Sequence, residues 1–433
     1  MINKIKKRHN YKILFIVVLT SFLMACGNGN GSESKEDSDE PVIIEFAHHD
    51  STGETEEKVK RFNKENDDIQ IKFVELPATP TDKFNKFSTW FNSESKTPDV
   101  LLIDITWPGM YAAADWIAPI DSYLEEEDDD YLDRFWDVAV DAGQIDGKQY
   151  GIQGFIDVGL NYYRKDLLDK YDLDVPETWD EMIETTEKVR KEEGNNDLNG
   201  FIYQGDQIEG VVINFLEFLW GIGGEIEVDG EIRVDTPEAI EALTLMQDLI
   251  YEEKVSPVSV ATSNPDDNTN LYGNGETLFM RNWPSSDANL KKTDVEGKYD
   301  VTTLFHGEDA EESYPSTGGW MPVINNFSEH KDEAWEVIKF YLSDEEQESL
   351  AINSSQFPTV ESVYEMDDAI EAQPLLGDLS DMLENAKARP VLRNYEQFSR
   401  ALQKEINLVL NNEKTPEEAV KDAQKDIDEE VNE

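Results

Sequence analysis

The chain has 433 residues, of which 94 are Asp or Glu and 38 are Lys or Arg, and its formal net charge at pH 7 is -56. Such an acidic surface repels nucleic acid and anionic lipid, so neither is expected to be a partner. The length exceeds that of one ordinary hydrophobic core, and two lobes are therefore expected. Because acidic residues occur along the whole chain, we interpret them as a halophilic surface that is solvated in a salty medium; docking to a basic partner is the alternative.

Residues 1–25 have the pattern of a secretory signal peptide, because five basic residues precede an apolar run, residues 13–25, that is too short to span a bilayer. Cys26 is the only cysteine, which excludes a disulfide within the chain and a cysteine-based zinc site. Residues 23–26, Leu-Met-Ala-Cys, resemble a bacterial lipobox, and this resemblance implies that Cys26 carries lipid, including palmitate. Residues 26–40 would then be a lipidated N-terminus and flexible tether, since residues 27–40 have no apolar side chain.

Strand and helix patterns alternate over the first part of the mature chain. Strands are expected at 43–46, 69–73 and 100–103, with amphipathic helices at 56–66 and 82–92 between them. This order is typical of a parallel sheet in an α/β fold. Because parallel strands end at one edge of the sheet, Asp104 is placed where α/β proteins bind ligands, with Trp107 beside it. The alternative is that Asp104 caps the following short helix and Trp107 belongs to the core.

The rest of the chain adds further expected elements. Residues 238–254 and 329–342 have the spacing of amphipathic helices, and Ser328 is expected to cap the second. The last helix is predicted to begin at Thr415, where Pro416 and Glu418 complete a capping box. Residues 195–206 match an EF-hand loop in part, although a turn into a strand at 201–203 fits them better. The five His residues lack metal-ligand spacing, so neither metal nor cofactor is expected.

Five separated segments resemble one protein family in matching order. They are residues 98–121, 148–168, 279–284 (Phe-Met-Arg-Asn-Trp-Pro), 316–321 (Ser-Thr-Gly-Gly-Trp-Met) and 388–391 (Ala-Arg-Pro-Val). Together they resemble the family 1 extracellular solute-binding proteins of bacterial ABC sugar importers, particularly the trehalose/maltose-binding branch. The resemblance spans about residues 42–425.

This resemblance implies a two-lobed α/β periplasmic-binding-protein fold of type II, like that of maltose-binding protein. It implies a hinge of three segments, near residues 153–157, 316–321 and 376–380. The N-lobe would comprise residues 41–154 and 320–377, and the C-lobe residues 155–319 and 378–433.

The resemblance also implies a set of ligand-binding residues. They are Glu54, Asp104, Phe155, Asp157, Glu209, Trp283, Gly319, Trp320 and Arg389. The acids would accept hydrogen bonds from sugar hydroxyls, Arg389 would donate one, and the two Trp rings would stack on the apolar faces of the sugar. Glu56 is an alternative to Glu54. The branch has Tyr at the position of Phe155 and an Arg where this chain offers Lys83.

The function implied is that of a substrate-binding lipoprotein of an ABC transporter. It would capture an α-linked disaccharide such as trehalose or maltose and deliver it to a membrane permease. We expect a monomer that is not an enzyme, anchored through Cys26 to the extracellular face of the cytoplasmic membrane. The alternatives are a binder of another solute such as a polyamine or compatible solute, an adhesin or sensor, or a secreted glycoside hydrolase using Asp104 and Asp157.

Overall fold

The computed structural model describes residues 40–431, except residues 51, 129, 229, 311, 379–382, 384, 391 and 393. The described residues from Pro41 onward form one compact unit by their contacts. The expected signal peptide and Cys26 lie outside the described residues, and so does part of the expected hinge segment at 376–380. No helix among the described residues is long and apolar enough to span a membrane.

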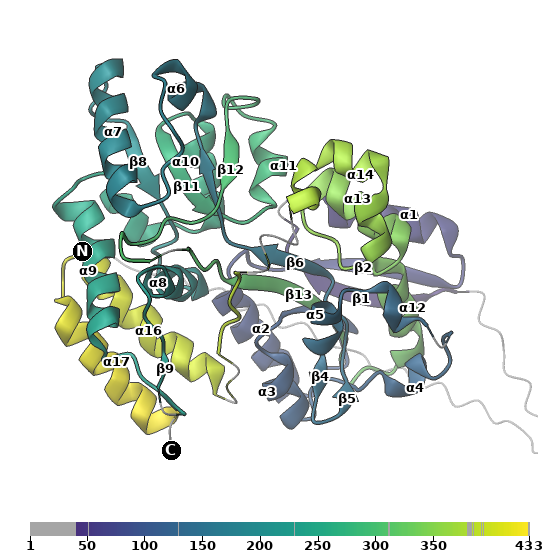
Figure 1. The fold of residues 1–433 in the computed structure, drawn as a ribbon. Helices are drawn as coiled ribbons and strands as arrows, with labels where there is room; N and C mark the ends of the chain where they lie inside the picture. The colour runs from purple at the N-terminus through teal and green to yellow at the C-terminus, as the bar shows by residue number, and fades with distance from the viewer. Residues whose placement is uncertain are drawn as a thin grey trace, which may run out of the picture. The chain divides into compact units, whose positions relative to one another are not determined.

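A five-stranded sheet organises the first lobe, in the order β2-β1-β3-β13-β6 (Figure 1). Its strands are β1 (Val42–His48), β2 (Ile69–Glu75), β3 (Val100–Asp104), β6 (Phe155–Val158) and β13 (Thr317–Ile324). The first three are parallel, as the strand and helix patterns predicted. β13 runs antiparallel to both β3 and β6, so a segment distant in sequence completes the sheet.

Helices connect and flank this sheet. They are α1 (Glu54–Glu65), α2 (Pro80–Asn92), α3 (Pro108–Ala113), α4 (Asp121–Leu124), α5 (Asp137–Asp141), α12 (Lys331–Tyr341), α13 (Asp344–Ser354) and α14 (Asp367–Ala372). The lobe also contains the hairpin β4 (Gln144–Ile145) and β5 (Lys148–Gln149), with 3-10 turns at Leu132–Arg134, Glu361–Glu365 and Pro374–Asp378. The expected apolar face of α2 is buried, through Phe84, Phe87 and Phe91.

The predicted cap of the helix near residue 329 is wrong. α12 begins at Lys331, its N-cap residue is His330, and no side chain caps it. The Ser328 hydroxyl instead donates to Asp99 Oδ1 at 2.5 Å and accepts from the His330 backbone N–H at 3.0 Å. The Ser328 hydroxyl therefore bonds to the buried carboxylate of Asp99, just before β3, and does not cap α12.

A four-stranded sheet, β12-β7-β11-β8, organises the second lobe. Its strands are β7 (Leu160–Tyr163), β8 (Asn199–Ile202), β11 (Thr277–Asn282) and β12 (Asp300–Thr302). β11 is parallel to β8 and antiparallel to β7. Only Gly159 separates β6 from β7, so the chain passes directly from one sheet into the other.

The second lobe is rich in helices. They are α6 (Lys165–Lys170), α7 (Trp179–Glu193), α8 (Glu209–Gly221), α9 (Pro237–Tyr251), α10 (Pro265–Gly273), α11 (Ser286–Leu290), α16 (Tyr395–Leu410) and α17 (Pro416–Glu430). A short pair, β9 (Glu227–Val228) and β10 (Glu231–Ile232), and a 3-10 turn at Val258–Thr262 complete it. Every residue of α8 is buried, because its 13 residues are mostly apolar and pack against α9 and α16. The capping box predicted at Thr415 and Glu418 is present at the start of α17.

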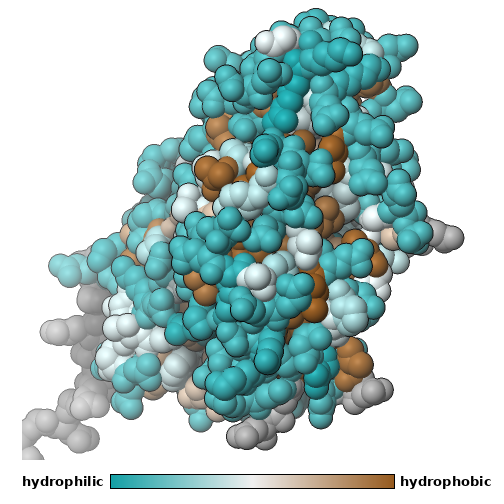
Figure 2. All heavy atoms as spheres, turned by 90° about the vertical axis from the view of Figure 1, so that its left-hand side faces the viewer, coloured by the Kyte–Doolittle hydropathy of each residue, from teal (hydrophilic) through white to brown (hydrophobic). Residues whose placement is uncertain are grey.

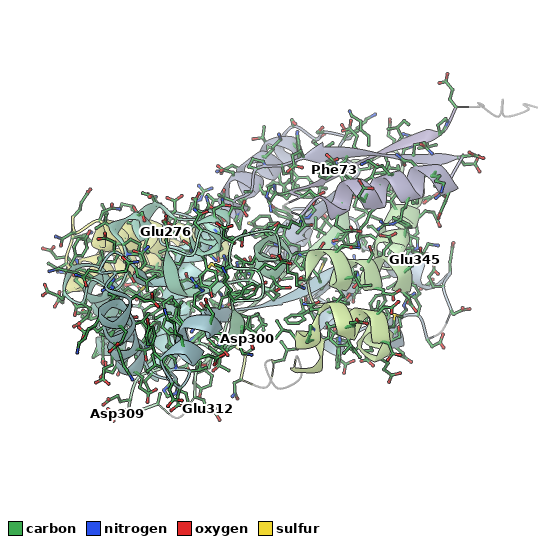
Figure 3. All side chains as sticks on the ribbon, turned by 90° about the horizontal axis from the view of Figure 1, so that it is seen from above. Phe73, Glu276, Asp300, Asp309, Glu312 and Glu345 are labelled. Atoms are coloured by element: carbon green, nitrogen blue, oxygen red, sulfur yellow. The ribbon has the colours of Figure 1, made fainter. Side chains whose placement is uncertain are left out.

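The surface carries the acidic residues. Figure 2 shows hydrophilic side chains over most of one face, with hydrophobic ones in small scattered groups. The carboxylates of Glu276, Asp309, Glu312 and Glu345 are exposed, and Asp309 and Glu312 lie at the outer edge of the molecule in Figure 3. The described residues, which include the 195–206 segment, contain no group of three or more His, Cys, Asp or Glu side chains that could hold a metal ion.

Candidate functional site

One cleft brings together most of the residues that the sequence singled out. It has an empty volume of about 1170 Å³, partly open to solvent, and residues from both sheets and their connections line it. Eight of the nine expected ligand-binding residues are on its wall: Glu54, Asp104, Phe155, Asp157, Trp283, Gly319, Trp320 and Arg389. Glu209 is buried but does not line the cleft.

Asp104 ends β3 at the edge of the cleft, as the strand-end argument predicted. Its Oδ1 accepts from the backbone N–H of Thr106 at 2.9 Å and from the Thr106 hydroxyl at 2.7 Å. The Arg389 guanidinium donates to the same oxygen at 2.9 Å. Asp104 does not cap α3, whose N-cap is Trp107 without a side-chain bond. Asp104 is therefore held by its own turn and by a cation from a distant segment.

Glu209 has a different place from the one expected. It accepts from Arg389 Nη1 at 2.9 Å and also from the hydroxyls of Tyr395 and Ser399. Arg389 thus lies between two buried carboxylates, Asp104 and Glu209, and its own side chain is 2% exposed. Glu209 was expected to contact the ligand; it does not line the cleft, and its carboxylate contacts Arg389 instead.

The indole of Trp107 also lies away from the cleft wall. Trp107 is 3% exposed and packs among the aromatic rings of Phe84, Phe87 and Tyr111. Its ring meets Trp320 edge to face, with 5.6 Å between the centroids. The alternative in which Trp107 belongs to the core is the observed one, and its contact with the site is indirect, through Trp320.

Asp157, in β6, presents a carboxylate without a partner. Its Oδ1 is buried and accepts no hydrogen bond from any described residue. Burial raises the pKa of Asp157 to about 7, although the cations of Arg281 and Arg389 oppose the shift. A buried acceptor without a donor costs free energy, and a hydroxyl of a ligand would remove that cost.

The raised pKa of Asp157 predicts a pH-dependent stability. The folded protein holds this proton up to about pH 7, whereas the unfolded chain releases it near pH 4, so this group lowers the free energy of unfolding as pH rises between those values. Asp157→Asn removes the ionisation and is expected to raise the free energy of unfolding at pH 8 by about 2–4 kcal/mol relative to wild type, with no gain at pH 4. Urea denaturation of the unliganded proteins at both pH values measures this difference.

The control for this prediction is Asp309→Asn, because Asp309 is exposed. This substitution should leave the difference between pH 4 and pH 8 unchanged. An Asp157→Asn variant whose gain is equal at the two pH values would contradict the assignment of the ionisation to Asp157.

Trp283 follows β11 and rests on a buried ion pair. The Arg281 guanidinium lies 4.0 Å from the centroid of the Trp283 ring. Arg281 in turn donates to both carboxylate oxygens of Glu217, with 2.7 Å between Nε and Oε2. Glu217 Oε1 also accepts from the backbone N–H of Ser316 at 3.1 Å, just before β13. The ring is fixed against this pair on the wall of the cleft.

Gly319 permits the close pairing of β6 and β13 at the site. Its φ is +136°, and a Cβ there would lie 2.0 Å from Gln153 Nε2 and 2.3 Å from the Phe155 carbonyl oxygen. No other residue fits this position without moving the backbone. Gly319 therefore sets the positions of Phe155 and Trp320, which pair across the two strands.

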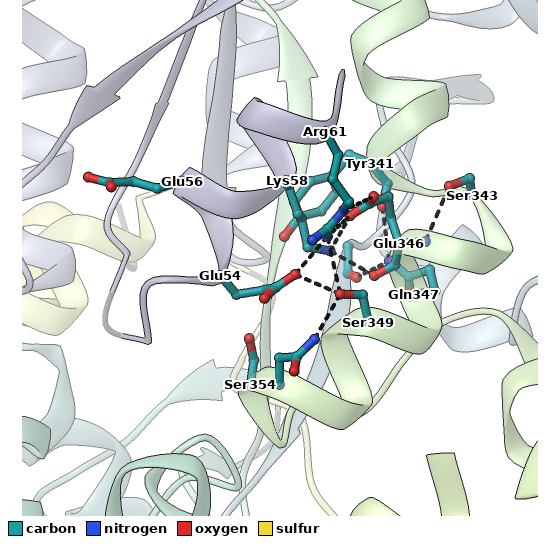
Figure 4. Close-up of polar contacts among 12 residues, drawn as sticks. Glu54, Glu56, Lys58, Arg61, Tyr341, Ser343, Glu346, Gln347, Ser349 and Ser354 are labelled. Atoms are coloured by element: carbon teal, nitrogen blue, oxygen red, sulfur yellow. Dashed lines mark hydrogen bonds and ion pairs between the residues drawn. The ribbon is translucent and has the colours of Figure 1, made fainter. Parts of the chain in front are cut away.

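Glu54 belongs to a polar cluster at the start of α1 (Figure 4). Its Oε1 accepts from Arg61 Nη2 at 2.7 Å and from the Ser349 hydroxyl at 2.6 Å. Arg61 is also paired with Glu346. Glu56, the alternative to Glu54, points away from this cluster in Figure 4 and does not line the cleft. The structure therefore places Glu54, rather than Glu56, at the site.

The wall also includes residues that were not assigned to the site from the sequence, among them His48, Lys83 and Tyr341. His48 ends β1, so the strand-end argument used for Asp104 would have found it. Tyr341 lies in the expected amphipathic helix at 329–342, and no sequence signal there separates a core position from a position on the cleft wall. Lys83 lies in the first turn of α2, where the trehalose/maltose-binding branch has an Arg. Its ammonium group lies over the ring of Trp320.

Comparisons with known proteins bear on the family and the fold. Residues 48–348 match the family described as bacterial extracellular solute-binding protein. A solved structure described as "Maltose bound T. maritima MalE3" is 34% identical, covers 89% of this chain and 99% of its own, and has a TM-score of 0.84. This agreement confirms the two-lobed α/β fold.

Curated proteins give the same picture. A "Probable ABC transporter-binding protein" of Deinococcus radiodurans is 29% identical over 361 residues, which cover 81% of this chain and 84% of that protein. An "Arabinooligosaccharide-binding protein" of Halalkalibacterium halodurans is 22% identical over 86% of this chain and 85% of its own length.

Proposed function

Because this chain belongs to the bacterial extracellular solute-binding protein family, we propose that it captures a neutral sugar in the cleft and delivers it to the permease of an ABC importer. The ligand is an α-linked disaccharide such as maltose or trehalose. The observation that carries this proposal is that the cleft is lined both by the Trp283 ring and by the Asp157 carboxylate, whose Oδ1 has no hydrogen-bond partner among the described residues. Sugars present apolar C–H faces and hydroxyl donors together, and these two groups complement both.

The remaining polar groups support a neutral ligand. Asp104 is paired with Arg389 and Glu54 with Arg61. Because Asp157 holds its proton up to about pH 7, these three carboxylates offer little charge to a polyamine. The similarity to a maltose-bound protein supports a sugar of this class.

Isothermal titration calorimetry against maltose, trehalose, sucrose, glucose, glycine betaine and spermidine tests the proposal. We expect heat of binding with an α-linked disaccharide and none with spermidine or betaine. Binding of a cation with no response to any sugar would contradict the sugar assignment. Chromatography of the sugar after incubation checks the hydrolase alternative, because cleavage products would contradict a pure binding role.

Ligand capture is proposed to depend on movement of the lobes. The expected lobe boundaries at residues 154/155 and 319/320 would separate β6 and part of β13 from the five-stranded sheet to which they belong, so we propose that the first crossing lies at Gly159 and the second before Thr317. The direct passage from β6 to β7 supports a crossing near Gly159, and the Ser316 contact with Glu217 supports another before β13. A sugar that contacts both lobes would favour the closed state.

We also propose that the protein acts as a monomer held at the outer face of the cytoplasmic membrane by lipid on Cys26. The lipobox-like residues 23–26 support this anchor. Cys26→Ser is expected to release the protein into the culture medium, because two acyl chains give stable membrane attachment and their loss leaves none. Immunoblots of membrane and medium fractions measure the release, and unchanged retention of the variant would contradict the anchor.

A further inference from the structure

Gln204 brings a side-chain amide without a hydrogen-bond partner to the cleft. The residue is 1% exposed and lies on the cleft wall. Its Nε2 is buried and has no hydrogen-bond partner among the described residues. A buried donor that stays unpaired costs free energy, and most such groups in folded proteins have a partner. Because the amide lies on the wall, a ligand in the cleft can supply the missing partner.

The sheet of the second lobe places Gln204 near Trp283. β8 ends at Ile202, two residues before Gln204, and β11 ends one residue before Trp283. The two strands are parallel neighbours in the sheet (Figure 1), so both residues lie at the same edge of it. This is the strand-end geometry that places Asp104 at the edge of the first sheet, and α/β proteins bind ligands at such edges.

One network of polar contacts holds both residues. The backbone N–H of Gln204 donates to Asn214 Oδ1 at 2.7 Å, and Asn214 Nδ2 donates to Glu217 Oε2 at 3.1 Å. The same carboxylate accepts from Arg281, whose guanidinium lies against the ring of Trp283. The backbone of Gln204 and the ring of Trp283 are therefore fixed relative to each other before a ligand arrives, which lowers the entropic cost of binding.

Gly210 leaves room for the amide on the cleft wall. It lies in the first turn of α8 and also lines the cleft. A Cβ at this position would lie 2.2 Å from Gln204 Oε1. The side chain of Gln204 therefore packs directly against the backbone of this turn, which restricts where its amide can point.

We propose that Gln204 is a specificity-determining ligand contact whose Nε2 donates a hydrogen bond to a hydroxyl oxygen of the sugar ring that stacks on Trp283. The inference rests on the proposed function and deepens it, and Gln204 is not among the ligand-binding positions that the sequence resemblance implied. A sugar without a hydroxyl at that place leaves the amide unpaired, so the site rejects it. The amide is neutral and therefore selects among sugars by hydroxyl position without adding charge to the cleft.

Calorimetry with maltose and its monodeoxy analogues tests this contact. Gln204→Met keeps the length of the side chain and removes the donor, and we expect maltose binding about five- to a hundredfold weaker. The analogue that lacks the contacted hydroxyl should bind Gln204→Met at least as tightly as wild type, whereas the other analogues should lose the same factor as maltose. Equal losses with every analogue would overturn the inference, because no single hydroxyl would then receive the hydrogen bond.

Gln424→Met is the matched control. Gln424 is 3% exposed and lies on α17, its Oε1 accepts from the backbone N–H of Val234 at 2.6 Å, and it does not line the cleft. We expect this control to melt at a lower temperature than wild type, because a buried N–H loses its partner, and to bind maltose equally well. Unliganded Gln204→Met should melt at or above the temperature of wild type, because an unpaired buried donor is removed.

The affinity of Gln204→Met decides between this inference and the proposed function. A variant that binds maltose as tightly as wild type would overturn the inference alone, whatever its melting temperature, since a buried water would then satisfy the amide. If wild type binds trehalose and not maltose, the monodeoxy trehaloses take the place of the maltose analogues. Wild-type protein that binds no sugar of the panel would overturn the proposed function and this inference together.

Discussion

Trp283→Ala is expected to weaken disaccharide binding by about 2–4 kcal/mol, which corresponds to a dissociation constant roughly thirty- to a thousandfold higher. The loss combines the stacking surface with the apolar area that the ring removes from water. The expectation is large because Trp283 does not move freely: Arg281 lies 4.0 Å from its ring centroid and is held in turn by Glu217. A ring fixed before binding loses little conformational entropy when the ligand arrives.

Trp90→Ala is the control for this substitution, because Trp90 is a partly exposed ring on α2 away from the cleft. We expect its dissociation constant to match that of wild type in the same calorimetric titration. A Trp283→Ala variant that is correctly folded and binds within a factor of three of wild type would show that this ring is not the stacking surface.

Arg389→Met is expected to lower the free energy of unfolding by about 3–5 kcal/mol, the usual result of removing one partner from a buried ion pair. The guanidinium lies between Asp104 and Glu209, whose side chains are both 7% exposed. Its Nη2 is 2.9 Å from Asp104 Oδ1, and its Nη1 is 2.9 Å from Glu209 Oε1. Without it, two carboxylates remain buried together without their cation. Ligand affinity should fall as well, because Asp104 loses the group that fixes it.

Arg233→Met is the matched control, since Arg233 pairs with Asp235 at the surface, where both side chains are over a third exposed. Its cost should stay below about 1 kcal/mol. Adding Glu209→Gln to Arg389→Met should recover part of the lost stability, because one of the two unpaired charges is removed. Urea denaturation at pH 8 measures all three, and equal costs for Arg389→Met and Arg233→Met would contradict the buried pairing.

Features encoded by local sequence were predictable. The alternation of strands and helices predicted the parallel order of β1, β2 and β3, and Asp104 follows from that order because parallel strands end at one edge. The capping box at Thr415 was predictable because it involves only neighbouring residues. The resemblance implied eight residues that do line the cleft. They are far apart in the sequence, and no periodic pattern links them.

Features that depend on tertiary partners were not predictable. Glu209 has the same sequence context whether it faces a ligand or Arg389, and only the fold brings the two side chains together. The Ser328 hydroxyl donates to Asp99, 229 residues earlier in the chain, and does not cap the helix. The role of Trp107 depended on the rings around it, which come from other parts of the chain.

A crystal structure of the protein with the disaccharide that it binds in calorimetry tests the central claim most directly. We expect one sugar ring against Trp283 and a sugar hydroxyl within hydrogen-bond distance of Asp157 Oδ1. A sugar that contacts neither Trp283 nor Asp157, or a sugar bound outside the cleft, would contradict this assignment of the site.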